Sequence, residues 1–217
     1  MDRIYNRIAG QSLERIAALS DGVFAFAMTL MVLEIRIPQP SSVHTDRDLW
    51  LALMALGPKC LTYLVSFMTL GIFWVGQQTQ FNHFARSDRN LSWIHIAFLA
   101  AVAMTPFSTL LLGQFITLRL ALVVYWLNIL ALGAALLWSW SYARGAGLCK
   151  AEADDAVSRA MVRRIVVAQT LYAAGAALCL VSNYLAMAAI LAVQVGYATG
   201  LHWQPPTRHA GEQPRTP

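Results

Sequence analysis

Long apolar runs alternate with short polar links along the chain. Each run approaches the roughly 20 residues that a helix needs to cross the hydrocarbon core of a bilayer. The links contain helix breakers such as Pro38 and Pro40, while Pro58 and Pro106 lie inside runs and are expected to start or kink helices. The pattern predicts an all-α polytopic membrane protein. Its six transmembrane helices are expected within residues 1–202, at about 16–37, 49–76, 91–112, 118–142, 160–182 and 184–201, ahead of a disordered cytoplasmic tail at 203–217.

Composition supports the membrane assignment. Of the 217 residues, 58% are hydrophobic and only 12% are charged, and the mean hydropathy of +0.52 lies well above that of an ordinary soluble domain. Lysine and arginine collect on one side of the expected topology, which predicts that both termini are cytoplasmic. This bias explains the net charge of +5 without a nucleic-acid partner. That side carries Arg3, Arg7, Arg15, Arg86, Arg89, Arg144, Lys150, Arg159, Arg163, Arg164, Arg208 and Arg215, whereas Arg36, Arg47 and Arg119 lie opposite and Lys59 lies inside the second run.

The first apolar run is the most informative stretch, because a carboxylate, Asp21, lies at its base. A charged side chain in a membrane helix is costly and normally faces protein, water or a partner. At about 100° per residue, Ser20 and Asp21 point away from a narrow and uniformly apolar stripe. The members of that stripe are Leu19, Gly22, Phe26, Leu30, Leu33 and Ile37.

The same stretch resembles a known motif. Arg15, Leu19, Ser20 and Asp21, followed by GVFAFAMTLMVLEI, resemble the R-x-x-x-F-S-D first-helix motif of the transmembrane protein 175 family of potassium channels in its prokaryotic six-helix form. Leu19 departs from the usual phenylalanine. The resemblance implies an integral protein of the prokaryotic plasma membrane that assembles as a homotetramer, with the first helix lining a pore for potassium ions.

Carried over by position, the resemblance places a hydrophobic constriction at Phe26, Leu30 and Leu33, with Thr29 beside it. Such a neck admits an ion only after partial dehydration, which costs less for potassium than for sodium. This implies a potassium-selective leak-type channel. Phe26 stands where the family usually has isoleucine or leucine, and it could block the pore, line it, or rotate into a helix contact. The Thr29 hydroxyl could meet the ion, although bonding to its own preceding turn is favoured.

The resemblance also implies a structural polar network near the cytoplasmic end, holding the first helix to the second and third. Its members on this chain would be Arg15, Ser20, Asp21, Trp74, Gln77, Gln78 and His95. Relatives commonly carry histidine after the tryptophan, where this chain has Gln77–Gln78. Glutamine can donate a hydrogen bond to a carboxylate, but it does not titrate.

Two other functions remain open from the residues themselves. One is a proton-coupled or small-solute transporter that uses Asp21 as its titrating group, and the other is a non-conducting membrane scaffold. An enzyme is not expected, because no nucleophile is identified beside a base. No cofactor or metal site is expected either, since no two of the five histidines share a ligand spacing on one helix and the three cysteines lack paired spacing.

Overall fold

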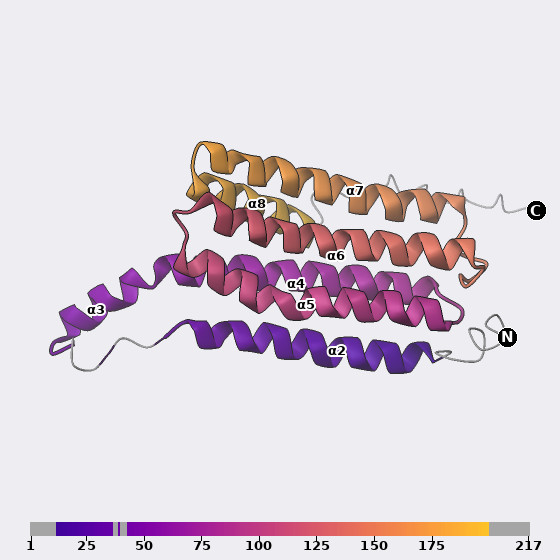
Figure 1. Ribbon diagram of the computed structural model, residues 1–217, viewed down its shortest axis with the longest axis horizontal. Helices are drawn as coiled ribbons and strands as arrows, with labels where there is room; N and C mark the ends of the chain where they lie inside the picture. The colour runs from indigo at the N-terminus through magenta and orange to yellow at the C-terminus, as the bar shows by residue number, and fades with distance from the viewer. Residues whose placement is uncertain (1–11, 37–38, 40–42, 200–217) are drawn as a thin grey trace, which may run out of the picture.

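The computed structural model describes residues 12–36, 39 and 43–199, and its regular secondary structure is helical throughout this part of the chain. Successive long helices run antiparallel along one common axis (Figure 1). Two short 3₁₀ segments, Met31–Glu34 and Leu178–Leu180, extend α2 and α7. Within the described residues the seven helices are α2 (Leu13–Leu30), α3 (Asp46–Ala55), α4 (Gly57–His83), α5 (Arg89–Gln114), α6 (Arg119–Gly145), α7 (Asp155–Ala177) and α8 (Asn183–Ala198).

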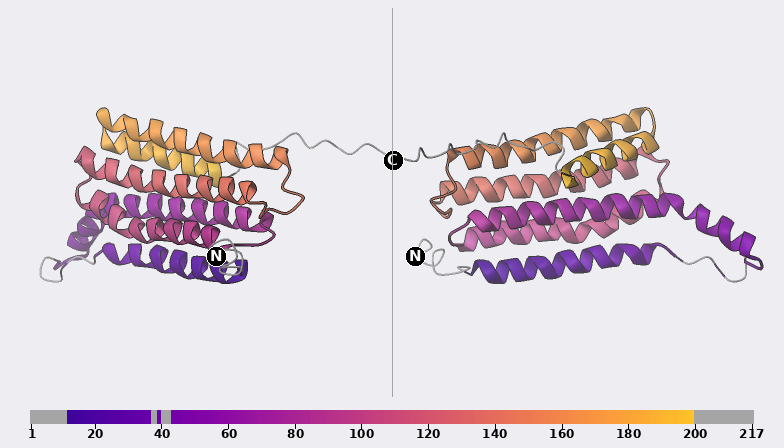
Figure 2. Two further views of the ribbon diagram at one scale, coloured as in Figure 1. Left: turned by 45° about the vertical axis from the view of Figure 1, so that its right-hand side comes forward. Right: turned by 180° about the vertical axis from the view of Figure 1, so that it is seen from behind.

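The long helices are stacked in layers. Helix α2 forms one edge of the bundle, α4 and α5 cover its inner face, α6 and α8 follow, and α7 forms the opposite edge (Figures 1 and 2). The short helix α3 projects from one end of this stack. Helix α2 packs mainly against α4, α5 and its own 3₁₀ extension, and one of its faces is left uncovered by the described part of the chain.

Four of the seven described helices, α2, α3, α5 and α7, begin after a polar residue whose side chain caps the first turn. Carboxylates of Asp88 and Asp154 accept hydrogen bonds from the backbone N–H three residues ahead, at α5 and α7. Thr45 and Asp48 form a reciprocal capping box at α3. The bond between Asp48 and the Thr45 side chain, with backbone bonds from His44 and Thr45, lowers the pKa of Asp48.

The second predicted helix is interrupted. A single helix was expected over 49–76, whereas the structure has α3 ending at Ala55 and α4 running over Gly57–His83. Pro58 lies in the first turn of α4, where its missing N–H costs nothing, and the chain changes direction there. Helix α3 contains no buried residue and lies outside the packed bundle. The apolar run concealed this break because both pieces are apolar.

The other helix limits also differ in detail. Helix α2 begins at Leu13 and changes to 3₁₀ at Met31, where an α-helix was expected over 16–37; Ile37 lies outside the described residues. The helix expected at 160–182 begins at Asp155, one turn earlier, because Asp154 caps it. The tail at 203–217 lies outside the described residues.

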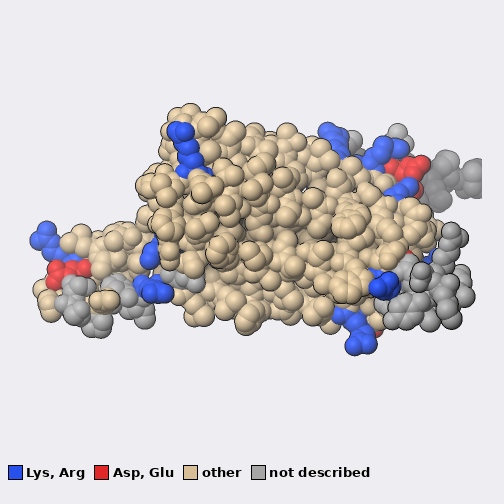
Figure 3. Space-filling model, in the orientation of Figure 1, with Lys and Arg blue, Asp and Glu red and all other residues tan. Residues whose placement is uncertain are grey.

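Four helical segments of the described chain are long and apolar enough to cross a membrane: Leu13–Leu33, Gly57–His83, Arg89–Gln114 and Arg119–Gly145. Asn183–Thr199 is apolar but shorter, and α7 carries arginines in its first half. Charged side chains gather toward the ends of the bundle and leave the middle of the visible face uncharged (Figure 3). Such a belt is expected of a protein embedded in lipid.

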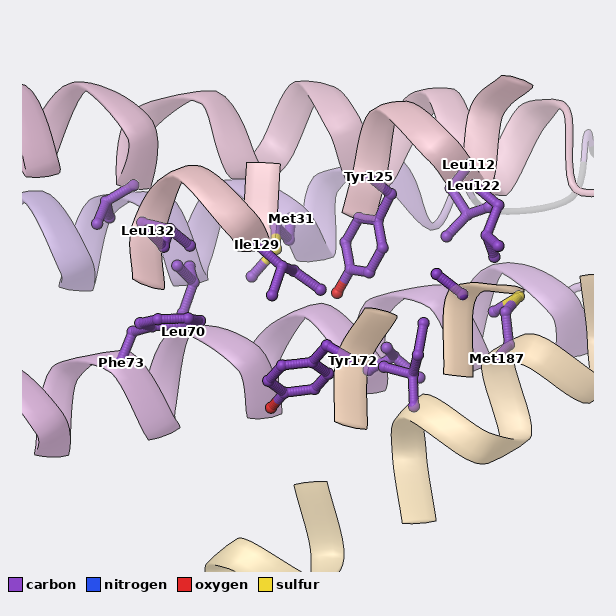
Figure 4. Packing of buried hydrophobic residues seen from close by; sticks show 14 of the residues in the cluster. Met31, Leu70, Phe73, Leu112, Leu122, Tyr125, Ile129, Leu132, Tyr172 and Met187 are labelled. Carbon is purple, nitrogen blue, oxygen red and sulfur yellow. The ribbon is translucent and has the colours of Figure 1, made fainter. Parts of the chain in front are cut away.

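The bundle interior is tightly filled with apolar side chains. In the view of Figure 4, Leu70 and Phe73 of α4 lie below Leu132 of α6, and Met187 of α8 lies below Leu122 of α6 at the other end of the same buried cluster. A second buried cluster lies at the end where α4 turns into α5. There the ring of Phe84 stacks on Trp140 with centroids 6.0 Å apart. These contacts hold α4, α5 and α6 as the frame on which α2 is mounted.

Candidate functional site

Helix α2 has two chemically different faces. Ser20, Phe24, Ala27 and Met31 follow one another at spacings of three and four residues and are buried against α4 and α5. On the uncovered side, Leu19 is 52%, Phe26 65% and Leu33 71% exposed. A large apolar surface of this kind on a helix normally faces lipid or another protein chain.

The predicted apolar stripe falls largely on this uncovered side. Leu19, Gly22, Phe26 and Leu33 are exposed and Leu30 is half-buried. An open groove of about 420 Å³ runs between α2 and α5 here, and it is lined by Leu19, Gly22, Phe26 and Leu30 together with Ala103 and Pro106. Phe26 is therefore not a core residue of this chain.

Thr29 also lies on the exposed side of α2. Its hydroxyl donates to the backbone carbonyl oxygens of Ala25 at 2.9 Å and of Phe26 at 3.0 Å. This is the back-bonding to the preceding turn that threonine commonly forms in membrane helices. The hydroxyl proton is thus used inside the helix, and only the oxygen lone pairs face outward.

Asp21 joins α2 to α4 at the base of the helix. Its Oδ1 accepts a hydrogen bond of 2.7 Å from the indole Nε1 of Trp74 and one of 3.1 Å from Nε2 of Gln78. Trp74 and Gln78 are four residues apart and so lie on the same face of α4. Bonds to a carboxylate are stronger than those between neutral groups.

Ser20 begins a second chain of contacts that continues into the bundle. Nε2 of Gln77 donates to the Ser20 hydroxyl at 3.0 Å and lies 3.2 Å from Nδ1 of His95. Because an amide N–H donates, Nδ1 accepts, and in the neutral ring the proton is on Nε2, 3.2 Å from the Ser139 hydroxyl. Ser20, Gln77 and His95 are fully buried. Four helices, α2, α4, α5 and α6, are linked in this way.

Arg15 is the one predicted network residue that stands apart. Among the described residues its guanidinium forms no ion pair with Asp21; its backbone N–H is instead capped by Ser12. The side chain lines a groove of about 300 Å³ beside Leu19, Ser92 and His95. The groove opens at the base of the same uncovered side of α2.

Two groups of polar residues escaped the sequence reasoning. One is Ser139, a small hydroxyl inside an apolar run, which has no local signal. The other is a buried cluster at mid-bundle, in which Tyr125 contacts Thr69 at 2.9 Å and Ser66 at 3.3 Å. Thr109 donates to Ser66 at 2.7 Å, and Gln194 donates to Thr69 at 2.6 Å. The sequence signal for this cluster is limited to five hydroxyl or amide side chains scattered through apolar runs.

The described residues contain no group of three histidine, cysteine or acidic side chains arranged to hold a metal ion. What the arrangement provides is a helix with one uncovered apolar face, fixed at its base by hydrogen bonds to its neighbours. Such a helix can contribute to a surface shared by several copies of the chain.

Comparison with known proteins agrees with this architecture. Residues 15–106 match the family described as "Endosomal/lysosomal potassium channel TMEM175". A potassium channel of Streptomyces collinus is 34% identical over 191 residues, covering 84% of this chain and 91% of that protein. One of Chamaesiphon minutus is 32% identical over 188 residues, covering 85% and 92%.

A solved structure extends the likeness to the fold. The crystal structure of a lysosomal potassium-selective channel TMEM175 homologue from Chamaesiphon minutus matches with a TM-score of 0.76 at 29% identity, covering 88% of this chain and 98% of that one. The sequence relatives and the structure therefore agree over nearly the whole described bundle, and the chain belongs to the TMEM175 family.

Proposed function

We propose that this chain is a potassium-selective leak-type channel that assembles as a homotetramer, with α2 of each subunit lining a central pore. The observation that carries the proposal is the uncovered apolar face of α2, on which Leu19, Phe26 and Leu33 are each more than half exposed. In a closed ring each subunit presents the same helix to the axis. The potassium channels of Streptomyces and Chamaesiphon, which share about a third of its residues, support the choice of ion.

The constriction is assigned to Phe26, Leu30 and Leu33. At each of these positions the four subunits contribute one apolar side chain to a ring, and the rings together form a narrow neck. An ion enters the neck only by losing part of its hydration shell, which favours the more weakly hydrated potassium ion over sodium. Thr29 offers its oxygen lone pairs beside the neck, since its hydroxyl proton is bonded within the helix. Potassium is the permeant ion in this proposal and not a resident cofactor.

The polar contacts at the base of α2 serve as its anchor. A helix that lines a pore cannot be held by packing on its pore face, so attachment must come from the opposite face and from its ends. Asp21 supplies two charge-assisted bonds to α4, and Ser20 connects to Gln77 and His95 in the interior. Arg15 is assigned to the same end of the helix, where its side chain lines the groove beside Leu19.

For the membrane topology we propose six spans within residues 1–202, with both termini in the cytoplasm of a prokaryotic cell. Four helical segments of the described chain are long and apolar enough to cross a membrane, and we assign α7 and α8 as the fifth and sixth spans. Support comes from the antiparallel order of the long helices and from the excess of lysine and arginine at the ends assigned to the cytoplasm. Residues 203–217 are assigned to a disordered cytoplasmic tail.

Ion flux from liposomes that contain the purified tetramer tests this function. Efflux should follow the potassium gradient, should not saturate at low concentration, and should be several-fold slower when sodium replaces potassium. Saturable uptake coupled to a proton gradient, and abolished by Asp21→Asn, would instead identify a transporter. A tetramer that passes no ion under any gradient would identify a scaffold.

A further inference from the structure

A cavity of about 100 Å³ lies at the end of the bundle opposite the contacts of Asp21. Its wall is formed by the residues that follow the 3₁₀ extension of α2, by the first turns of α4 and by the last turns of α5. The groove beside Phe26 is lined by apolar residues, whereas this cavity is lined by charged and polar side chains as well as apolar ones.

Two cationic side chains line this cavity. Arg36 follows the 3₁₀ extension of α2, and Lys59 lies in the first turn of α4. Arg36 is exposed and Lys59 is half-buried, so a ligand can reach both from outside the bundle. Lysine and arginine atoms are visible on the surface where α3 leaves the bundle (Figure 3).

No carboxylate of the described residues lines the cavity beside these cations. The salt bridge that the described side chains contain joins Arg144 to Asp155, at the other end of the bundle. The acidic residues of α3 lie in its first turn, at the end that is remote from α4. Two like charges beside one cavity disfavour each other, and a bound anion favours both. The cavity therefore has the charge of an anion site.

Neutral donors accompany the two cations. The Tyr63 hydroxyl is on a half-buried residue and the Gln114 amide is on an exposed one, and both residues line the cavity. Each group can donate a hydrogen bond to an anion. The hydroxyl of Thr62 is not counted among these donors, because it donates to the carbonyl oxygen of Lys59 at 2.9 Å. The planar fork of an arginine matches the oxygen atoms of a phosphate group, and a lysine adds a compact positive charge.

We propose that this cavity binds a phosphate group, carried by an anionic lipid or present as free phosphate. Its volume is several times the ~10 to 15 Å³ that one water molecule requires, so a larger polar group can enter. Lys59 lies near the start of one membrane-spanning helix and Gln114 at the end of another, which places the cavity near the level of the lipid headgroups. Ile35 and Leu110 add apolar wall beside the cations, where a lipid chain can lie.

The bound group would link α2 to α4 at this end of the bundle. Asp21 already joins the two helices at the other end, through hydrogen bonds from Trp74 and Gln78. A phosphate group that contacts both Arg36 and Lys59 provides a second polar link between them. The inference rests on the fold and on the charges around the cavity. It does not depend on which ion is conducted, so the binding experiment and the flux experiment can fail separately.

Native mass spectrometry of the full-length protein tests the site with three probes: phosphatidylglycerol, the diacylglycerol with the same acyl chains, and inorganic phosphate. We expect phosphatidylglycerol to bind several-fold more tightly than diacylglycerol, because the headgroup carries the anion. Binding of inorganic phosphate without a preference for phosphatidylglycerol over diacylglycerol would identify free phosphate as the ligand and also support the proposal. Equal binding of the two lipids, with no binding of inorganic phosphate, overturns it.

Variants connect the binding to this cavity. Lys59→Gln and Arg36→Gln should each weaken binding of the phosphate-bearing probe several-fold, whereas Lys59→Arg keeps the charge and should retain most of it. Arg47→Gln is the matched control, since it removes one positive charge from α3, outside the cavity, and should leave binding unchanged. Native spectra count ligand on folded protein only, so a lower yield does not imitate a loss of binding. Equal binding by the wild type, Lys59→Gln and Arg36→Gln overturns the proposal.

Discussion

The indole Nε1 of Trp74 donates a 2.7 Å hydrogen bond to the carboxylate of Asp21, and this contact joins the outermost helix of the bundle to its frame. Gln78 adds a second bond to the same oxygen atom. Since the described residues contain no ion pair between Asp21 and Arg15, the carboxylate is held by neutral donors.

A double-mutant cycle on this contact gives the first prediction. Asp21→Asn and Trp74→Phe should each destabilise the protein, and the double variant should be destabilised by less than the sum, with a coupling energy of about 1 kcal/mol for a hydrogen bond to a partly exposed carboxylate. Thermal unfolding in detergent measures the change in stability of each single variant and of the double variant. Asp21→Asn should also lower the yield of tetramer. Strict additivity would show that the two side chains do not support each other.

A second prediction concerns crosslinking between subunits. Single cysteines at Leu30 and Leu33 should form disulfides between subunits, because both positions fall on the assigned pore side. Cysteine at Met31 should not, since that side chain is 1% exposed and packs inside its own subunit, and Met28 is half-buried on the same side. Oxidation followed by non-reducing electrophoresis gives the answer. Efficient crosslinking at Met31 but not at Leu33 would show that the opposite face of α2 meets the neighbouring subunits, and this would contradict the pore assignment.

The third prediction tests Phe26 as the narrowest ring. Phe26→Ala should raise potassium flux strongly and reduce discrimination against sodium, because a wider neck lets both ions keep more of their hydration. Phe26→Ile should raise flux with less loss of selectivity. Within its subunit Phe26 is 65% exposed, so neither variant should destabilise the fold as a buried Phe→Ala change does, by about 3 to 5 kcal/mol. A destabilised Ala variant without added flux would place Phe26 in a contact between helices.

Two glycines provide a matched test of packing. Gly133→Ala should destabilise the bundle by about 1 to 3 kcal/mol, because the new Cβ overlaps Gln169 on α7. Gly71→Ala, also within a helix, meets no atom within 4 Å and should be neutral or stabilising by up to about 1 kcal/mol. Chemical unfolding of both variants measures the difference. If Gly133→Ala and Gly71→Ala changed stability equally, the Gln169 side chain on α7 would be able to move away from α6 at little cost.

The sequence allowed the fold class and the order of the long helices to be predicted, because length and hydropathy determine where membrane helices form. It did not predict the break between α3 and α4. The apolar run continues through Leu56 and Gly57, so hydropathy could not separate a projecting helix from a packed one. Pro58 was expected to start or kink a helix, and it lies in the first turn of α4.

For the candidate site, helical spacing indicated which residues of α2 and of α4 lie together, but it did not indicate the contacts on the other helices. Gln77 and Gln78 follow Trp74 by three and four residues, so both lie near Trp74 on the surface of α4. The contact of His95 with Ser139 joins residues 44 positions apart, and no local pattern could indicate it. The roles assigned to these residues remain predictions that the variants above test.

Neighbouring positions of α2 lie in two different environments. Phe24 and Ala27 are buried in the subunit core, whereas Phe26 between them contributes nothing to it. Mutations on one face should therefore change folding and those on the other should change permeation, with little overlap. If the exposed face lines the pore as proposed, exchanging a few of its side chains should alter conductance while the fold that displays them remains intact.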